Sequence, residues 1–146
     1  MNFKPVQILS IGKSVPETIM TNDDLTKILD TSDEWISTRT GIKQRHIASG
    51  DENSTTFGVN AAKDALNKSG LNGEEIDLIV VATSNPYNIY PSTGCVIQDA
   101  IGAKNAIAFD ITVACNGMIY ALEIGRHFIN SGKYKNVFLV ATDTNS

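Results

Sequence analysis

Residues 108–128 have the sequence AFDITVACNGMIYALEIGRHF, in which one structural pattern gives way to another. Its first part is an apolar, β-branched run, which is typical of a strand buried on both faces. Its second part repeats apolar residues at helical spacing. The stretch therefore predicts a strand that turns into a helix, with Cys115 at the turn.

The same alternation of strand and helix patterns extends on both sides of this stretch. Strands are expected at residues 76–83, 105–112 and 136–143, and helices at 55–70, 92–103 and 115–132. A glycine stands at or near the end of each helix pattern, where glycine commonly caps a helix. Apolar strands alternating with helices indicate an α/β fold, with a mixed, mostly parallel sheet covered by helices.

The first part of the chain carries weaker patterns. A strand is expected at residues 6–16, helices at 21–29 and 31–41, and a loop or edge strand at 43–54. Thr21 or Asn22 is expected to cap the first helix, since these residue types favour N-caps. Thr31 or Ser32 is expected to cap the second helix, which should end near Gly41.

The composition excludes several classes of protein. The chain has 146 residues, 42% of them hydrophobic, and a net charge of −4, which argues against a nucleic-acid partner. No signal peptide or membrane span is expected, because no apolar run is long enough. Two cysteines make a poor disulfide framework, so reduced thiols and a cytoplasmic location are expected. The two histidines show no metal-binding spacing, and no metal is expected.

Cys115 can be interpreted in two ways. A free cysteine often behaves as a small buried hydrophobe, which would make it structural. At the start of a helix, however, the unpaired N–H groups and the helix dipole favour a thiolate. Gly117 would let the backbone or a ligand approach closely. Cys95 lies in an apolar helix pattern without catalytic context, so we expect a structural role for it.

Three segments, taken together, resemble the β-ketoacyl-acyl-carrier-protein synthase III family of the thiolase superfamily. They are FDITVACNGMIYAL at 109–122, TSDEWISTRTGIKQRHIA at 31–48 and IDLIVVATSNPYNIYPSTGCVIQDAIGA at 76–103. Their order and spacing match over nearly the whole chain. The resemblance implies a thiolase-like fold, with residues 1–146 as one N-terminal domain and the C-terminal half absent. A final strand that ends close to the chain terminus fits this expectation of an interrupted sequence.

The resemblance also implies a reaction. The thiolate of Cys115 would take an acyl group from acyl-coenzyme A. Malonyl-acyl-carrier-protein would then decarboxylate, and its carbanion would attack the thioester in a Claisen condensation that starts fatty-acid synthesis. An acyltransferase of this kind binds no permanent cofactor, and the coenzyme A thioester is its substrate. The Cys115 backbone N–H would supply one donor of the oxyanion hole.

Further site residues follow from the same resemblance. Trp35 would stack on the coenzyme A adenine, and Arg39, with Thr31 and Thr40, would contact the nucleotide end. Four residues separate Trp35 and Arg39, so the two also share a helix face and could simply stack on each other. Tyr90 would cross the interface of a homodimer into the acyl pocket of the partner, unless it is an ordinary loop aromatic.

Some features depart from the family pattern. Asn116 and Met118 replace residues common there, and no position matches the catalytic His and Asn of the second half. Lys43 and Arg45 could form a basic patch, although solvated loop charges are the simpler interpretation.

Three hypotheses remain open. The first is the nucleophile-bearing half of a synthase III, which needs a complementary half to condense. The second is a non-catalytic dimerisation or folding module. The third is another thiolase-like condensation of acyl-coenzyme A.

Overall fold

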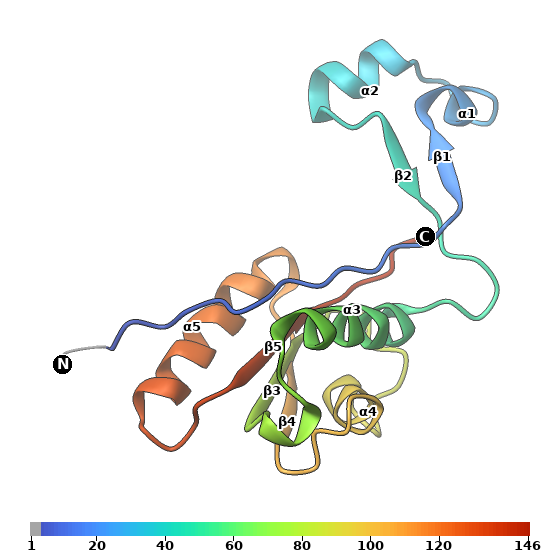
Figure 1. The fold of residues 1–146 in the computed structure, drawn as a ribbon. Coiled ribbons are helices and arrows are strands. Elements are labelled where there is room, and N and C mark those ends of the chain that lie inside the picture. The colour runs from blue at the N-terminus through green and yellow to red at the C-terminus, as the bar shows by residue number, and fades with distance from the viewer. Residues whose placement is uncertain (1–3) are drawn as a thin grey trace. The chain divides into compact units, whose positions relative to one another are not determined.

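The computed structural model describes residues 4–146, which form two compact units. One unit comprises residues 4–14 and Asn53–Asn145, and the other comprises Val15–Glu52 with Ser146. Figure 1 shows the elements of both units. The larger unit contains α3 (Ser54–Ser69), the 3-10 turn η1 (Gly73–Glu75), β3 (Leu78–Ala82), α4 (Thr93–Ala100), β4 (Ile107–Ile111), the 3-10 turn η2 (Ala114–Asn116), α5 (Gly117–Asn130) and β5 (Val137–Ala141).

A three-stranded parallel sheet organises the larger unit. Its strand order is β4-β3-β5, so the first strand in sequence is central, with Leu78 beside both Ile107 and Val137. Helix α4 connects β3 to β4, and α5 connects β4 to β5 (Figure 1). Parallel strands require such crossovers. The predicted parallel sheet covered by helices is confirmed.

Alternate residues of β3 serve opposite faces of the sheet. All five residues of this strand are buried, as its continuous apolar sequence predicts. Ile79 and Val81 pack into the core with residues of α3 and α4, including Ala62 and Ile97. Leu78 and Val80 face the other way and pack with Ala121 of α5. The sheet therefore has α3 and α4 on one face and α5 on the other.

The helix ends follow from local sequence. Asn53 caps α3 by accepting hydrogen bonds from the N–H groups of Thr55 and Thr56, and Gly70 ends the helix with φ of 75°. Helix α4 is capped by Ser92 and is also held from the sheet. The carboxylate of Asp110 on β4 accepts hydrogen bonds from the N–H groups of Thr93, at 2.9 Å, and Gly94, at 2.7 Å. A carboxylate satisfies the otherwise unpaired N–H groups and the positive end of the dipole.

Two predictions about strands need correction. Residues 6–16 contain no strand, since within the described chain they pair with no other strand, and Ile8 and Ile11 stay exposed. Side chains of the helices hold this segment: Asp64 of α3 accepts from the Lys13 N–H at 3.1 Å. The outer strands β4 and β5 are also less buried than predicted, because each has only one neighbouring strand.

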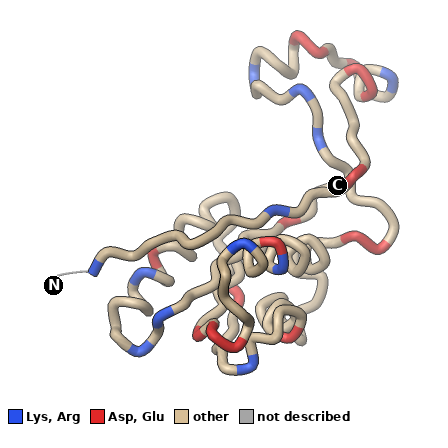
Figure 2. The backbone as a smooth tube through the Cα atoms, viewed as in Figure 1, with Lys and Arg blue, Asp and Glu red and all other residues tan. Residues whose placement is uncertain are grey.

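The smaller unit consists of two short antiparallel strands and two helices. It contains β1 (Ile19–Thr21), α1 (Asn22–Thr26), α2 (Asp33–Thr40) and β2 (Gln44–His46). Thr21 caps α1 and Ser32 caps α2, which ends at Gly41 with φ of 72°. These caps were among those predicted. The unit carries many acidic and basic positions on a short chain (Figure 2), and α2 has no buried residue.

Candidate functional site

Cys115 lies where the sequence predicts it, between a strand and a helix. Strand β4 ends at Ile111, the turn η2 contains Cys115, and α5 begins at Gly117. Ala114 has a φ of 48°, in the left-handed region that residues with a Cβ rarely occupy. Such strained turns cluster at functional sites, where they project a side chain away from the sheet.

Close packing at the start of α5 fixes this turn against the central strand. A Cβ atom at Gly117 would lie 2.6 Å from the Cβ of Ala82 on β3, so only glycine allows this approach. Of the two close approaches expected at Gly117, by the backbone or by a ligand, the structure shows the approach of the backbone to β3.

The Cys115 thiol is exposed and borders a cavity of about 230 Å³. The cavity is lined by Ala82, Ala114, Cys115, Gly117, Met118, Ala141, Thr142 and Asp143. These residues come from the carboxyl ends of β3 and β5 and from the start of α5. The carboxyl ends of parallel strands are where open α/β sheets bind ligands. An exposed thiol in a cavity of mostly small residues can act as a nucleophile on a ligand placed there.

Asp143 is the one charged residue of this lining, and the sequence reasoning missed it. Its Oδ1 accepts hydrogen bonds from the N–H groups of Ser84, at 2.7 Å, and Asn85, at 3.3 Å. It also accepts from the Thr83 hydroxyl at 3.3 Å. Asp143 thus joins the chain after β5 to the chain after β3. The available signal was the place of Asp143, two residues after the apolar run of β5.

A return contact strengthens this junction. The Asn85 side chain accepts a hydrogen bond from the Thr144 N–H at 3.2 Å and donates one to the Thr144 carbonyl. Thr142 donates to the Ser54 carbonyl at 2.6 Å, and the Ser54 hydroxyl donates to the Asn85 carbonyl at 2.8 Å. The floor of the cavity is therefore braced by hydrogen bonds between residues far apart in sequence.

Two other residues of interest in this unit lie outside the cavity lining. Tyr90 is on the loop between β3 and α4 and is 89% exposed, which makes it available to a ligand or to another chain. Cys95 is exposed on α4, so the expectation that it packs as a structural residue is wrong.

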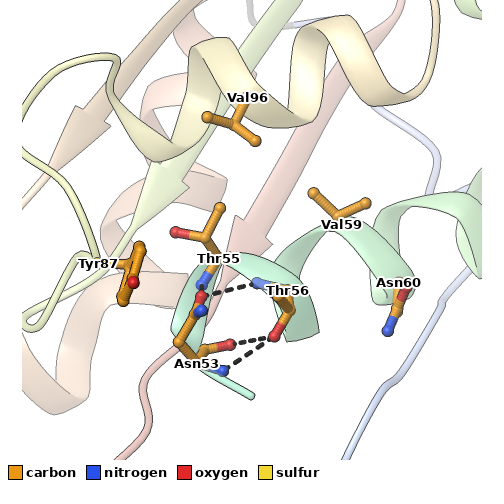
Figure 3. Close-up of a pocket in the computed structure, with 7 residues that line it drawn as sticks. All are labelled: Asn53, Thr55, Thr56, Val59, Asn60, Tyr87 and Val96. Atoms are coloured by element: carbon orange, nitrogen blue, oxygen red, sulfur yellow. Dashed lines mark hydrogen bonds between the residues drawn. The ribbon is translucent and has the colours of Figure 1, made fainter. Parts of the chain in front are cut away.

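A second cavity, of about 430 Å³, lies beside the start of α3 and contains none of the predicted site residues (Figure 3). It is lined by Asn53, Thr55, Thr56, Val59, Asn60, Tyr87 and Val96. Thr56 donates to the Asn53 carbonyl at 2.8 Å and accepts from its N–H at 2.9 Å. The hydrogen bonds drawn in Figure 3 belong to the cap of α3.

The smaller unit brings Trp35 and Arg39 together on α2. The Arg39 guanidinium lies 4.5 Å from the centre of the Trp35 ring, and the indole is 53% exposed. Thr40 uses its hydroxyl locally, donating to the Ile36 carbonyl at 2.7 Å. Thr31 directly precedes the cap of the same helix. The stacking alternative raised by the sequence is therefore the arrangement observed, with part of the indole still accessible.

Asn22 organises the surroundings of α2, and the sequence identified it only as a possible cap. It is 1% exposed and donates to Asp33 at 2.7 Å and to the Ile42 carbonyl at 2.8 Å. It accepts from Arg45 at 2.7 Å. The hydrogen bond from Asn22, followed by those from Ser37 and Lys43, lowers the pKa of Asp33. Lys43 and Arg45 therefore have structural partners.

The described residues show no metal site and no membrane helix. Within residues 4–146, no group of three or more His, Cys, Asp or Glu side chains is arranged to hold a metal ion. None of the helices in that range is long and apolar enough to cross a bilayer.

Several known proteins similar to this chain carry the same name. The family "3-Oxoacyl-[acyl-carrier-protein (ACP)] synthase III" matches residues 109–146. One relative is "Beta-ketoacyl-[acyl-carrier-protein] synthase III" from Clostridium perfringens (strain SM101 / Type A). Another is "Beta-ketoacyl-[acyl-carrier-protein] synthase III 1" from Bacillus anthracis. Each is 51% identical to this chain over 138 residues. Those alignments cover 94% of this chain and 42% and 44% of the relatives, so the chain spans less than half of their length.

A solved structure agrees with the sequence relatives. The 3-oxoacyl-[acyl-carrier-protein] synthase III from Aquifex aeolicus VF5 superposes with a TM-score of 0.87 and 50% sequence identity. The match covers 91% of this chain and 43% of that one. The expected fold, the N-terminal half of a thiolase-like synthase, is confirmed by this match.

Proposed function

Because the chain belongs to the β-ketoacyl-acyl-carrier-protein synthase III family, whose N-terminal half it matches, we propose that it carries the nucleophile of a condensing enzyme. In this proposal residues 1–146 are the N-terminal thiolase-like domain. Cys115 accepts an acyl group from acyl-coenzyme A. The observation that carries the proposal is the exposed Cys115 thiol, held at a strained turn in a cavity of small residues.

The first step is an acyl transfer. The Cys115 thiolate attacks the thioester carbonyl, the carbonyl oxygen takes up negative charge, and coenzyme A leaves as its thiolate when the carbonyl re-forms. The Cys115 backbone N–H is our proposed donor to the transient oxyanion, because such donors stabilise charge that develops only in the transition state. The result is an acyl-enzyme, which splits a difficult reaction into two easier ones.

The second step joins two substrates. Malonyl-acyl-carrier-protein loses CO₂, its carbanion attacks the thioester on Cys115, and the thiolate is released with the new carbon–carbon bond formed. This condensation would initiate fatty-acid synthesis. No histidine lines the Cys115 cavity in the part of the chain that the structure describes. We therefore assign the groups that assist decarboxylation to the remaining length of the family, as a complementary half.

The smaller unit is the proposed nucleotide-binding part. Trp35 offers an indole that is half exposed and can stack on adenine, and Arg39 offers a guanidinium suited to phosphate. Thr31 and Thr40 stand at either end of the same helix and are assigned to the nucleotide end of coenzyme A. Tyr90 is assigned to the acyl pocket of a partner subunit, in line with its exposure.

The direct test is the intact mass of the purified chain after incubation with acetyl-coenzyme A. One acetyl group should be added to the unmodified chain and to Cys95→Ala, and none to Cys115→Ala. Cys95 is the matched control because it is also an exposed thiol. Acetylation that persists in Cys115→Ala would contradict the assignment of the nucleophile.

A binding role has its own supporting observation. Helix α5 exposes neighbouring apolar side chains, namely Met118, Ile119, Tyr120 and Leu122. Apolar side chains exposed together at one end of a helix are candidates for an interaction site. We propose that the chain self-associates or binds a complementary half through α5. If Cys115 stays unmodified on a folded chain that associates in light scattering, the dimerisation or folding module becomes the better description.

A further inference from the structure

We propose that Asp143 is a specificity-determining residue of the Cys115 cavity, which makes the thiol select neutral acyl groups over acyl groups that end in a carboxylate. This inference rests on the proposed function and adds a selection rule to it. It concerns the acyl group that Cys115 accepts in the first step, not the second substrate.

Asp143 brings an uncompensated negative charge to the cavity. It lines the same space of about 230 Å³ as Cys115, and the other residues of that lining are uncharged. Among the described residues Asp143 forms no ion pair, and its hydrogen bonds come from two backbone N–H groups and one hydroxyl. None of these donors carries a positive charge, so the hydrogen bonds leave the negative charge of the carboxylate without a counter-charge.

The carboxylate is also held in one place. Oδ1 accepts from residues 83, 84 and 85, so the side chain cannot swing away without breaking three hydrogen bonds. A fixed charge acts on an incoming group more strongly than a mobile one, because no reorganisation is needed.

The size of the effect follows from Coulomb's law. A cavity of this volume spans about 8 Å, and two like charges at that separation in water repel enough to change a rate about twofold to threefold. Asp143 is exposed to solvent, so water keeps the repulsion near this size, and salt reduces it. An acyl chain with a terminal carboxylate, such as malonyl or succinyl, is therefore disfavoured relative to acetyl.

The matched control for Asp143 is Asp77, which lies at the amino ends of the strands of the same sheet. The carboxylate of Asp77, just before β3, accepts hydrogen bonds from the N–H groups of Lys135 at 2.7 Å and Asn136 at 2.9 Å. Asp77 thus joins β3 to β5 at their amino ends, much as Asp143 joins them at their carboxyl ends. Asp77→Asn removes the same charge away from the cavity.

The test measures alkylation of Cys115 by iodoacetate, which is anionic, and by iodoacetamide, which is neutral, in a Cys95→Ala background at low ionic strength. The ratio of the iodoacetate rate to the iodoacetamide rate should rise about twofold or more in Asp143→Asn and stay unchanged in Asp77→Asn. Asp143→Glu keeps the charge but moves it, so it should raise the ratio less than Asp143→Asn does. A change in the thiolate population alters both rates equally and cancels in the ratio. An unchanged ratio in Asp143→Asn, or an equal rise in Asp77→Asn, overturns the proposal.

A second measurement needs no variant at position 143, should Asp143→Asn fail to fold. Added salt should raise the ratio of the iodoacetate rate to the iodoacetamide rate for Cys115 in the chain that keeps Asp143. The rise should be larger than for the neutral thiol N-acetylcysteamine, because salt screens the carboxylate. Equal salt effects on both thiols overturn the proposal. Alkylation needs no acyl transfer, so this result stands apart from the acetyl-coenzyme A test of the proposed function.

Discussion

The two units of the chain reach a defined structure by different means. The larger unit buries an apolar strand, β3, whose five side chains are shared between two cores. The smaller unit has no buried residue in α2 and relies on hydrogen bonds that converge on Asn22. The proposed covalent chemistry belongs to the apolar unit, and the proposed recognition of a charged nucleotide belongs to the polar one.

Charge separates the units as well. The larger unit has eight basic and eight acidic residues, 8 − 8 = 0, while Val15–Glu52 has four basic and eight acidic residues, 4 − 8 = −4. The whole net charge of −4 therefore lies on the smaller unit (Figure 2). Electrostatic conditions should influence that unit more, and the difference can be tested in four ways.

The largest expected effect is a cavity in the apolar core. Ile79→Ala removes a fully buried side chain of β3 and should lower the free energy of unfolding of the larger unit by about 2–5 kcal/mol. Urea unfolding followed by circular dichroism measures this loss. Ile8→Ala, at an exposed position, is the control and should change little. Similar losses in both variants would contradict the conclusion that burial on β3 stabilises the larger unit, to which both positions belong.

The next effect concerns the polar centre of the smaller unit. Asn22→Ala leaves Arg45 and Asp33 without their shared partner and should cost about 1–3 kcal/mol. Trp35 is the only tryptophan, so its fluorescence reports the unfolding of this unit alone. Thr38→Ala, whose hydroxyl bonds only within α2, serves as the comparison. An unchanged Trp35 transition in Asn22→Ala would show that packing, not this network, holds the unit.

The third effect in size is a loss of stability of the smaller unit in acid. Hydrogen bonds from Asn22 and Ser37 lower the pKa of Asp33 below its unfolded value of 3.8. The carboxylate therefore contributes stability above that value, and the contribution is lost as the pH falls below about 4 and through the folded pKa. Trp35 fluorescence between neutral pH and about pH 3 should show this loss in the native sequence, and a smaller pH dependence in Asp33→Asn. Identical pH profiles would exclude Asp33 as the titrating group.

The smallest effect is expected for the exposed cation–π pair. Arg39→Ala should lower the stability of the smaller unit by no more than about 1 kcal/mol, since such pairs contribute little at exposed sites. It should also change the Trp35 emission, because the guanidinium lies over the ring. Arg39→Lys keeps the charge, and its stability should lie between that of the native chain and that of Arg39→Ala. A large loss of stability would mean that the pair covers a core.

Local signals in the sequence predicted much of this structure. The caps at Ser32, Gly41 and Gly70 depend on residues close in sequence, and so does the buried run of β3. The position of Cys115 also follows from one continuous stretch. The roles of Asp143 and Asn22 could not be predicted, because their partners lie up to 60 residues away for Asp143 and 23 for Asn22.

The failed strand at residues 6–16 has a related cause. Its apolar residues satisfy a strand pattern, but a strand also needs a neighbour to pair with. Inside residues 4–146 the segment instead rests on α3, where the backbone at Gly12 approaches Ala61 and Ala65 too closely for any side chain. A pattern within one segment does not reveal whether a partner strand is present.

The position of β4 and β5 at the two margins of the sheet affects how the protein behaves at high concentration. Each of these strands presents a row of N–H and C=O groups that no other strand pairs with in the described chain. Such rows can template cross-β growth between molecules, and Ile107 adds an exposed apolar side chain on β4. Dilute samples should therefore stay clear in storage, with turbidity rising steeply as the protein is concentrated.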